Sequence, residues 1–575
     1  MCRLLVAFCL LVTLSLSPFA VAKAEEASSG TGAAAATQCS TPTIHTTSGL
    51  VCGLEQEVAG NPTPTSKPIS AFLGIPYGQS TAGENRWAPP KPIVQWSAEL
   101  RSDIHKATRF GPSCPQKLRP GVQLELSEDC LSLNIWTPVP LDKIGSSDPV
   151  PVMVFIYGGS FREGTTSNPL YDARSLAATG GVLVVTINYR VGALGFLSGT
   201  DGLKGNFGLM DQRLALEWVH DNIAEFGGEP DKITLFGESA GAMSVGLHLI
   251  SPESQPLFNA AIMESNPYGI PYKSLHISKR FGTIFKFNLG CEFEGLACLR
   301  EKPFQEVVAQ QSSGMLPIVS LLTGFAAELI WAPVVDGKEV PTQPSGSAIT
   351  KPVIIGTNLN EGIIFAVSQQ TKLGGGHKKV LKLQYKVMLE IMFSVKIAHR
   401  IRAIPRYKPH DGDNTNVLSH LITDYLFTCP NRHVMAQAKA PVWAYQFTHP
   451  PSFSVWPDVK LCAPAKETVC HAAELPFVFA NAEPAQIQAK PQRHELQPDE
   501  KQLSRLVMSY WAQFAKREHP NGDGSPKWQR FTKAAPTRFI LNTTTSSKTD
   551  LKSNCTFWDE IGYDMPGLLE RGRKF

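Results

Sequence analysis

Five short and almost continuous apolar runs occur along the chain, separated by longer stretches of helical character. They cover residues 151–157 (PVMVFIY), 182–188 (VLVVTIN), 232–236 (KITLF), 352–355 (PVII) and 441–447 (PVWAYQF). Strands that are apolar on both faces are typical of a parallel sheet covered by helices on each side. The pattern therefore predicts an α/β fold with a large, mostly parallel central sheet. Ligand sites in such sheets lie beyond the carboxyl ends of the strands.

A longer apolar run, from Leu4 to Leu16, lies at the N-terminus, with Arg3 before it and a small-x-small cleavage site after it. The run is shorter than the ~20 residues that a membrane span needs. We therefore expect a cleaved export signal over residues 1–24 and a flexible leader over 25–38. No later stretch is apolar enough to span, so we expect no stable membrane span and a secreted protein, or a periplasmic one in a Gram-negative host.

Residues 374–408 interleave lysines and arginines with apolar side chains. The pattern predicts a pair of amphipathic helices with a solvated basic face. A second interpretation is a basic surface that attracts anionic lipid or an anionic substrate.

Composition and charge narrow the function classes. The chain has 575 residues, 43% hydrophobic and 18% charged, which is globular composition, and its net charge is only +4. Nothing in this balance favours a nucleic-acid partner. No cysteine or histidine spacing fits zinc, so no metal is expected.

Ten cysteines remain after the export signal is removed, and an even number in an exported chain indicates disulfides. Neighbouring positions suggest four pairs and leave two cysteines over, although sequence alone does not fix the connectivity. The neighbours are Cys39 with Cys52, Cys114 with Cys130, Cys291 with Cys298 and Cys462 with Cys470, and Cys429 and Cys555 remain. In a eukaryotic host, Asn542 and Asn554 are also glycosylation sequons.

A candidate nucleophile follows the apolar run that ends at Phe236. Ser239 lies in Gly-Glu-Ser-Ala-Gly, with a predicted helix over residues 242–250 after it. Small residues on both sides allow the sharp strand-to-helix turn that exposes such a serine. The context predicts a serine nucleophile, which supplies its own chemistry and needs no cofactor.

A serine hydroxyl needs a base, and the base needs an orienting carboxylate. When the serine lies on such a strand-to-helix turn, the acid follows it in the chain and the histidine comes last. Glu361 follows the run at 352–355, and His471 lies between Cys470 and residues 472–477 (AAELPF). Spacing alone leaves His449 as a rival base, because it is closer to the strand at 441–447.

An oxyanion needs preorganised N–H donors. One is expected from Ala240, directly after the nucleophile. The others are expected from the glycine-rich turn after the strand at 151–157, at Gly159 and Ser160.

Several separated motifs resemble the type-B carboxylesterase family. Residues 226–241 (FGGEPDKITLFGESAG) resemble its serine signature. Residues 128–136 (EDCLSLNIW) resemble its second signature and depart only at Ser132, where an aromatic residue or Thr is usual. Further similar motifs are GIPY at 74–77, NYRVG at 188–192, GNFGLMDQR at 205–213 and PVVDG at 333–337.

The resemblance implies a single α/β-hydrolase domain, which we place at residues 39–565 with a tail over 566–575, and a carboxylic ester hydrolase with a small-molecule ester as substrate. It favours Glu361 as triad acid and His471 as base. It supports the pairs Cys114–Cys130 and Cys291–Cys298 and makes Cys429–Cys555 plausible. It also implies a structural ion pair between Arg86 and Glu128.

Two departures from the family bear on specificity. Ser160 stands where a third glycine is usual, but the oxyanion turn needs only its backbone N–H. Cholinesterases carry a Trp for the quaternary ammonium between the cysteines matching Cys114 and Cys130, and this chain has none there. Choline esters are therefore not expected.

Two alternative functions remain. One is a lipase, although the segment between Cys114 and Cys130 is short beside the lid of fungal lipases in this family. Rates on micellar triglyceride and on soluble short-chain esters separate the two. The other is a neuroligin-like adhesion or binding protein, which the intact set Ser239, Glu361 and His471 disfavours.

Overall fold

The computed structural model describes most of the chain. The predicted export signal and leader, up to residue 37, and the predicted tail 566–575 lie outside the described residues. Everything described belongs to one compact unit, Gln38–Phe575. The described residues are 38–58, 68–96, 104–144, 146, 148–313, 329–373, 379–489, 494–548 and 552–563.

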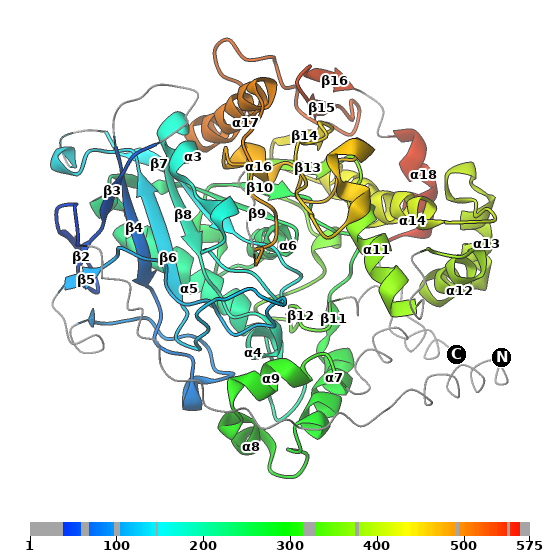
Figure 1. The fold of residues 1–575 in the computed structure, drawn as a ribbon, viewed down its shortest axis with the longest axis horizontal. Helices are drawn as coiled ribbons and strands as arrows, with labels where there is room; N and C mark the ends of the chain where they lie inside the picture. The colour runs from blue at the N-terminus through cyan, green and yellow to red at the C-terminus, as the bar shows by residue number, and fades with distance from the viewer. Residues whose placement is uncertain are drawn as a thin grey trace. The chain divides into compact units, whose positions relative to one another are not determined.

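An eleven-stranded sheet forms the centre of the described part of the chain (Figure 1). It is parallel from β8 to β15 and antiparallel at both edges. In spatial order the strands are β16 (Ser546–Lys548), β15 (Arg538–Leu541), β14 (Val442–Phe447), β13 (Val353–Asn358), β10 (Ala260–Glu264), β9 (Gly228–Glu238), β7 (Val150–Ile156), β8 (Leu183–Ile187), β6 (Ser132–Thr137), β4 (Ile69–Pro76) and β3 (Leu54–Gln56).

The five predicted strands are confirmed as β7, β8, β9, β13 and β14, which lie in the parallel part of the sheet. β10 was not predicted, and it lies between β9 and β13. The antiparallel strands β4 and β6 are buried throughout most of their length, so they extend the core rather than cover it. The predicted fold class, an α/β-hydrolase with a mostly parallel sheet, is confirmed.

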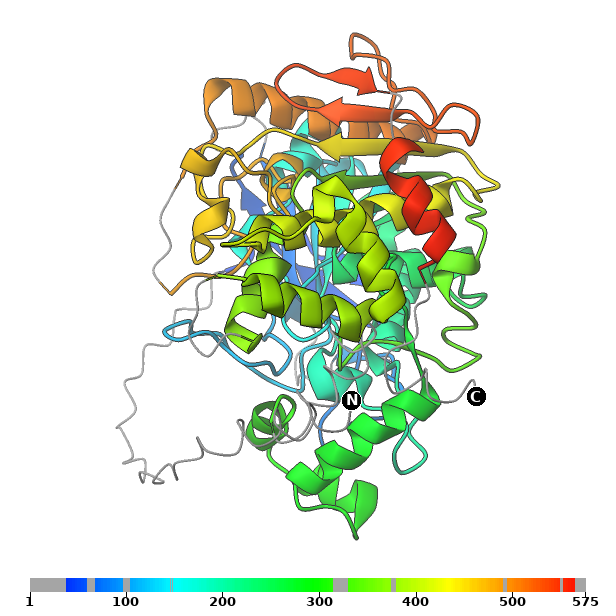
Figure 2. The ribbon, with the colours of Figure 1, turned by 90° about the vertical axis from the view of Figure 1, so that its right-hand side faces the viewer.

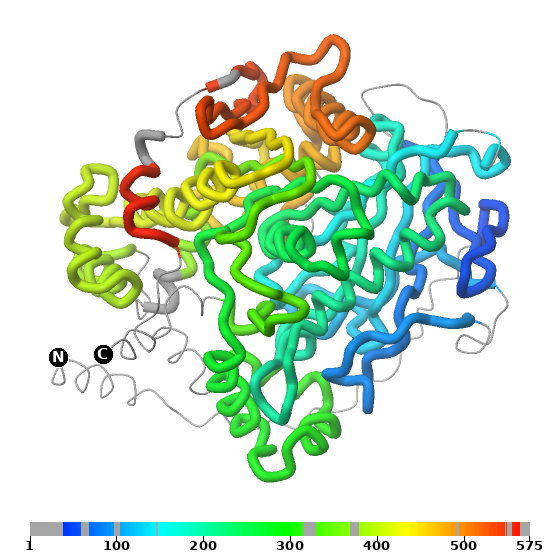
Figure 3. The backbone as a smooth tube through the Cα atoms, turned by 180° about the vertical axis from the view of Figure 1, so that it is seen from behind, coloured from blue at the N-terminus to red at the C-terminus, as the bar shows by residue number. Residues whose placement is uncertain are grey.

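Helices cover both faces of the sheet (Figures 1 and 3). α5 (Phe207–Asn222) and α6 (Ala240–His248) pack on one face, and α3 (Arg174–Gly180) and α17 (Pro498–Arg517) pack together on the other. The other helices are α4 (Gly192–Phe196), α7 (Leu275–Asn288), α8 (Gly295–Glu301), α9 (Phe304–Gln310), α15 (Cys429–Met435), α16 (Leu475–Val478) and α18 (Lys552–Ile561). Two small sheets lie apart from the central one. One consists of β1 (Ile44–Thr46), β2 (Gly49–Cys52) and β5 (Ile104–Lys106), and the other pairs β11 (Lys273–Ser274) with β12 (Val334–Val335).

A helical region is inserted between β13 and β14. It contains α11 (Gly362–Leu373), α12 (Lys382–Phe393), α13 (Val395–Ala403) and α14 (Thr415–Ile422). α12 and α13 occupy the basic segment for which two helices were predicted, and they pack against each other. In the described part of the chain, no helix combines the length and the apolar character needed to cross a bilayer.

Two buried ion pairs connect segments that are distant in sequence. Arg190 donates hydrogen bonds from Nε and Nη2 to the carboxylate of Asp211, at 2.8 and 2.7 Å. The two side chains are 3% and 0% exposed. Arg86 binds Glu128 through Nε at 2.7 Å and Nη2 at 2.5 Å, and its Nη1 donates to backbone carbonyls at the end of α8. The second pair matches the structural role that the family resemblance implies.

Asp211→Asn should lower the free energy of unfolding by about 3–5 kcal/mol, because it leaves the Arg190 charge buried without a counter-ion. Urea unfolding followed by tryptophan fluorescence measures the loss. Asp221→Asn is the matched control. Among the described residues, this exposed carboxylate has an ion pair only with His220, at 3.4 Å, so a change under about 0.5 kcal/mol is expected. Equal losses in the two variants would contradict the assigned role of Asp211.

Candidate active site

Ser239 occupies the sharp turn between β9 and α6. Its backbone has φ 55° and ψ −120°, a strained conformation for a residue with a side chain. A Cβ on Gly237 would lie 2.7 Å from the Ile156 carbonyl oxygen, and one on Gly241 would collide with the same atom. The two glycines therefore let this turn approach the end of β7, as the motif predicts.

A cavity of about 410 Å³ opens at the carboxyl ends of the central strands. Ser239 and His471 both line it, together with Gly159 and Ser160 of the turn after β7. Further walls come from residues 116–124, from α11 and from residues 456–459. The predicted nucleophile, the predicted base and two predicted oxyanion donors thus face one cavity.

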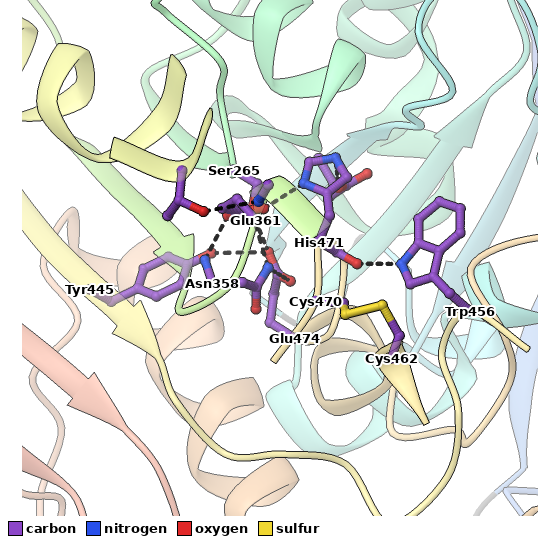
Figure 4. A network of polar contacts seen from close by, with 12 residues as sticks. Ser265, Asn358, Glu361, Tyr445, Trp456, Cys462, Cys470, His471 and Glu474 are labelled. Carbon is purple, nitrogen blue, oxygen red and sulfur yellow. Dashed lines mark hydrogen bonds and ion pairs between the residues drawn. A yellow bond between two sulfur atoms is a disulfide. The ribbon is translucent and has the colours of Figure 1, made fainter. Parts of the chain in front are cut away.

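Glu361 holds His471 from the side away from the cavity mouth. Its Oε2 lies 2.5 Å from Nδ1 of His471, and both side chains are buried (Figure 4). The other oxygen, Oε1, accepts from Ser265 Oγ and from the backbone N–H of Asn358, each at 2.6 Å. Because Nδ1 is occupied by a carboxylate, the imidazole presents Nε2 to the cavity.

The loop that carries His471 is anchored at several points. The Cys462–Cys470 disulfide closes it next to the histidine, and Trp456 Nε1 donates to the His471 carbonyl at 2.6 Å (Figure 4). The rings of Phe365 and Phe427 lie 5.2 and 5.4 Å from the imidazole. These contacts restrict the orientation of the ring before any substrate arrives.

Glu238, the residue before Ser239, faces the other nitrogen of His471. Its Oε1 lies 3.0 Å from Nε2, but neither atom has a hydrogen-bond partner among the described residues. Nε2 thus faces the cavity beside this carboxylate, and it can accept a proton from a donor there when the imidazole is neutral. Catalytic hydrogen bonds of this kind often close only in the substrate complex.

A second buried carboxylate supports Glu361 from behind. Glu474 accepts from Asn358 Nδ2 at 2.5 Å and from Ser265 Oγ at 3.3 Å (Figure 4). A third, Glu264 at the end of β10, accepts from Trp511 Nε1 at 2.5 Å. The histidine is thus surrounded by an unusually dense group of buried acids.

This crowding shifts the ionisation of the whole group. Burial raises the pKa of Glu238 to about 8, and repulsion from Glu474 and Glu361 adds to the shift. Burial also raises the pKa of Glu474 to about 7 and that of Glu264 further, each reinforced by a neighbouring carboxylate. For His471, burial alone lowers the pKa, but Glu238 and Glu361 raise it more, to about 9. The surroundings therefore stabilise an imidazolium.

His449, the rival base, is engaged elsewhere. Its Nε2 lies 3.3 Å from Glu500, in the first turn of α17. It does not line the cavity that holds Ser239. The fold therefore separates the two histidines that spacing alone left open.

The turn after β7 lies tightly against Ser239. A Cβ on Gly158 would be 2.9 Å from Ser239 Cβ. Gly159 and Ser160 have φ of 109° and 56°. The backbone N–H groups of Gly159, Ser160 and Ala240 make no hydrogen bond among the described residues, so they can donate to a bound group.

Sequence reasoning missed Ser265, Asn358 and Glu474, and gave Glu238 no role beyond its place in the motif. Asn358 and Glu474 lie within a few residues of Glu361 and His471, so polar residues near a candidate acid or base were one available indication. Ser265 had no such indication, because it reaches Glu361 only through the pairing of β10 with β13.

The remaining predicted sites are also visible in part. The ten cysteines that follow the predicted export signal are paired, as Cys39–Cys52, Cys114–Cys130, Cys291–Cys298, Cys429–Cys555 and Cys462–Cys470. The side-chain amide of Asn542 donates to Thr448, whereas the side chain of Asn554 lies outside the described part. No cluster suited to a metal ion occurs among the described residues.

Comparisons with known proteins identify the family of this chain. The profile of the carboxylesterase family matches residues 40–558. The chain belongs to the carboxylesterase family. Among its relatives, it is 36% identical to a cholinesterase of Mus musculus, over 90% of this chain and 86% of that protein. It is 35% identical to the crystal protein of Dictyostelium discoideum, over 88% and 90%, and 34% identical to an acetylcholinesterase of Bungarus fasciatus, over 87% and 84%. This carboxylesterase is a carboxylic ester hydrolase.

Glu238→Gln should shift the acid limb of the pH profile of kcat/KM to lower pH. The substitution removes a carboxylate 3.0 Å from Nε2, so the pKa of His471 falls and its neutral form is available at lower pH. Rates on a neutral ester between pH 5 and 10 measure the shift.

Glu163→Gln is the control for that measurement, because Glu163 lines the same cavity but is not among the groups that shift the pKa of His471. An unchanged limb in Glu238→Gln, or an equal shift in both variants, would contradict the assigned electrostatic role.

Proposed function

We propose that this carboxylesterase cleaves its substrate by acyl transfer to Ser239, with His471 as general base and Glu361 as the carboxylate that orients it. The observation that carries the proposal is the placement of His471. Its Nδ1 is held by Glu361 at 2.5 Å, while its Nε2 faces the cavity that Ser239 also lines. This is the arrangement that activates a weakly nucleophilic hydroxyl.

The proposed reaction has two steps. His471 Nε2 takes the hydroxyl proton as Ser239 Oγ attacks the ester carbonyl, which forms a tetrahedral oxyanion. The intermediate collapses, the alcohol leaves with the proton from His471, and the acyl group stays on Ser239. Water then attacks the acyl-enzyme by the same route and releases the acid. The buried carboxylates around His471 favour the imidazolium that forms in each step.

The N–H groups of Gly159, Ser160 and Ala240 are the proposed oxyanion donors. Their freedom from other hydrogen bonds supports this role. A single such donor typically contributes roughly 3–4 kcal/mol to the transition state. The Ser160 side chain is not required, because only the backbone N–H is used.

Export is the second part of the proposal. The complete pairing of the ten cysteines supports it, since disulfides persist in oxidising compartments. The predicted export signal over residues 1–24 supports the same conclusion.

Neutral or anionic esters are the proposed substrates, rather than choline esters. Two relatives are named cholinesterase and acetylcholinesterase. Here, however, the segment between Cys114 and Cys130 contributes Lys117 and Arg119 to the cavity wall instead of a Trp, and Arg162 adds a third cation. Against these stand three acids, Glu163, Asp458 and Glu238. Asp458 is paired with Arg119 at 2.8 Å, and burial raises the pKa of Glu238 to about 8, which favours its neutral form. The mouth therefore offers a quaternary ammonium no net attraction.

Ser239→Ala should abolish hydrolysis of a short p-nitrophenyl ester and labelling by a fluorophosphonate. His471→Ala should do the same, whereas His449→Ala and Ser160→Gly should keep activity within several-fold of the parent. Initial rates and labelling on a gel report both properties. Full activity of Ser239→Ala, or equal losses of activity in the two histidine variants, would contradict the proposed mechanism.

The parent enzyme should hydrolyse 3,3-dimethylbutyl acetate with a higher kcat/KM than acetylcholine, its cationic isostere. Lys117→Glu should narrow the difference, because it replaces a repelling charge at the mouth with an attracting one. The two kcat/KM values at low ionic strength test this. A preference for acetylcholine in the parent enzyme would contradict the proposed substrate class.

A further inference from the structure

The positive charge of the chain is concentrated in one segment. Residues 379–413 contain eight lysines and arginines and three acidic residues, an excess of five, which is larger than the net charge of +4 of the whole chain. No acidic residue occurs between Glu390 and Asp411. α12 and α13 form the larger part of this segment, and in Figure 2 they lie at the front of the view. A strong local field therefore surrounds these helices even though the protein as a whole is almost neutral.

Exposed apolar side chains gather on the same helices. Nine large apolar residues are exposed in the described part of the chain, and four of them fall within fifteen positions here. They are Leu381, Leu383, Val387 and Val395, with exposures of 42%, 72%, 43% and 56%. Singly exposed apolar residues are ordinary, but a group of them among lysines is not.

The helix geometry places both kinds of side chain on one face. Leu383 and Val387 are four positions apart and form one ridge of α12, and Lys382 and Lys386 form the neighbouring ridge. The opposite face is anchored in the core, where the buried Tyr385 donates to the Tyr407 carbonyl at 2.9 Å. α12 is therefore fixed with its mixed apolar and basic side outward.

The charges on this side are only partly neutralised. Lys382 pairs with Asp411 at 2.9 Å, and the arginines of α13 pair with Glu560 and Glu390. Lys379 and Lys386 form no ion pair with any described residue. Lys386 is close enough to Asp411 to help lower the pKa of that carboxyl, but it is not paired with it, so its charge and that of Lys379 can attract an anionic partner.

We propose that an anionic lipid surface docks on the α12 face, which we define as Lys379, Leu381, Lys382, Leu383, Lys386 and Val387. Lysines flanking the apolar ridge match lipid headgroups, and the ridge itself fits the boundary between headgroups and acyl chains. A soluble polyanion matches the lysines alone and leaves Leu383 in water. A second copy on a two-fold axis brings the same lysines face to face, where they repel.

The α12 face belongs to the same insertion as one wall of the cavity. α11 directly precedes the segment and contributes Ile364 and Phe365 to the cavity wall. The surface and the site thus belong to successive parts of one insertion between β13 and β14. The inference concerns binding alone and does not depend on the proposed catalytic residues.

Co-sedimentation of the full chain with vesicles tests the proposal. Vesicles of phosphatidylcholine with 30% phosphatidylserine should bind the protein, pure phosphatidylcholine should bind it far less, and 0.5 M NaCl should release it. The triple variant Lys379→Glu, Lys382→Glu and Lys386→Glu should bind on the order of a hundredfold more weakly, since each basic residue near such a surface contributes roughly fivefold. Leu383→Ser with Val387→Ser should also weaken binding.

Matched controls keep the result interpretable. Lys106, Lys232 and Lys533 are exposed lysines outside this segment, and their triple replacement by Glu makes the same change in net charge. Phe293→Ser removes an apolar side chain that is 94% exposed elsewhere. Neither control should change vesicle binding, and ester hydrolysis by every variant reports folding.

Several outcomes would overturn the proposal. They are no binding to anionic vesicles, equal binding to neutral ones, or equal losses in the control variants. Binding lost in the lysine variant but unchanged in Leu383→Ser with Val387→Ser would identify a polyanion site. A dimer in sedimentation velocity that only the apolar variant dissociates, without vesicle binding, would identify a contact between two copies.

Discussion

The backbone at Ser239 is strained, and the centre of the sheet is arranged to maintain that strain. A residue with a side chain adopts φ 55° and ψ −120° only where its surroundings leave no alternative. Here β9 is fixed between β7 and β10, the Ser239 N–H donates to the Glu264 carbonyl at 2.9 Å, and two glycines permit close contact with Ile156. The parallel sheet thus acts as the rigid frame that keeps one hydroxyl exposed.

The second constraint is electrostatic, and it follows from the first. His471 lies at the carboxyl ends of buried strands, in a region with little water where isolated charge is costly. The protein places Glu361 and Glu238 on the two nitrogens of His471 and connects Glu361 to Glu474 through Ser265. Burial and mutual repulsion raise the pKa of Glu238 and of Glu474, so these carboxylates oppose one another's ionisation. The group therefore supports a single positive charge on the imidazole.

Much of this could be predicted from the sequence, because local patterns encode it. β7 and β9 are apolar on both faces, and the glycines around Ser239 mark the turn. β10 was missed although turn residues flank it, because its five residues, AAIME, begin with two alanines and end in a glutamate, a composition unlike that of the other buried strands. That glutamate is tolerated only because Trp511, from a helix 247 positions away, donates to it. His449 and His471 could not be separated by spacing, since the distinction arises from Glu500 and Glu361 in the folded chain.

The distribution of charge shows why the net value of +4 says little about this protein. Acidic groups gather where water is excluded, around His471, and basic groups gather on the solvent-exposed α12 and α13. Buried charges act at short range on their neighbours and are compensated there, whereas exposed charges act together over about a Debye length. The interior group therefore acts on the protonation of His471, and the surface group acts on charged partners in solution. The small net charge of the chain reveals neither group, because the acidic group is buried and the basic group is exposed to solvent, and their charges cancel in the sum.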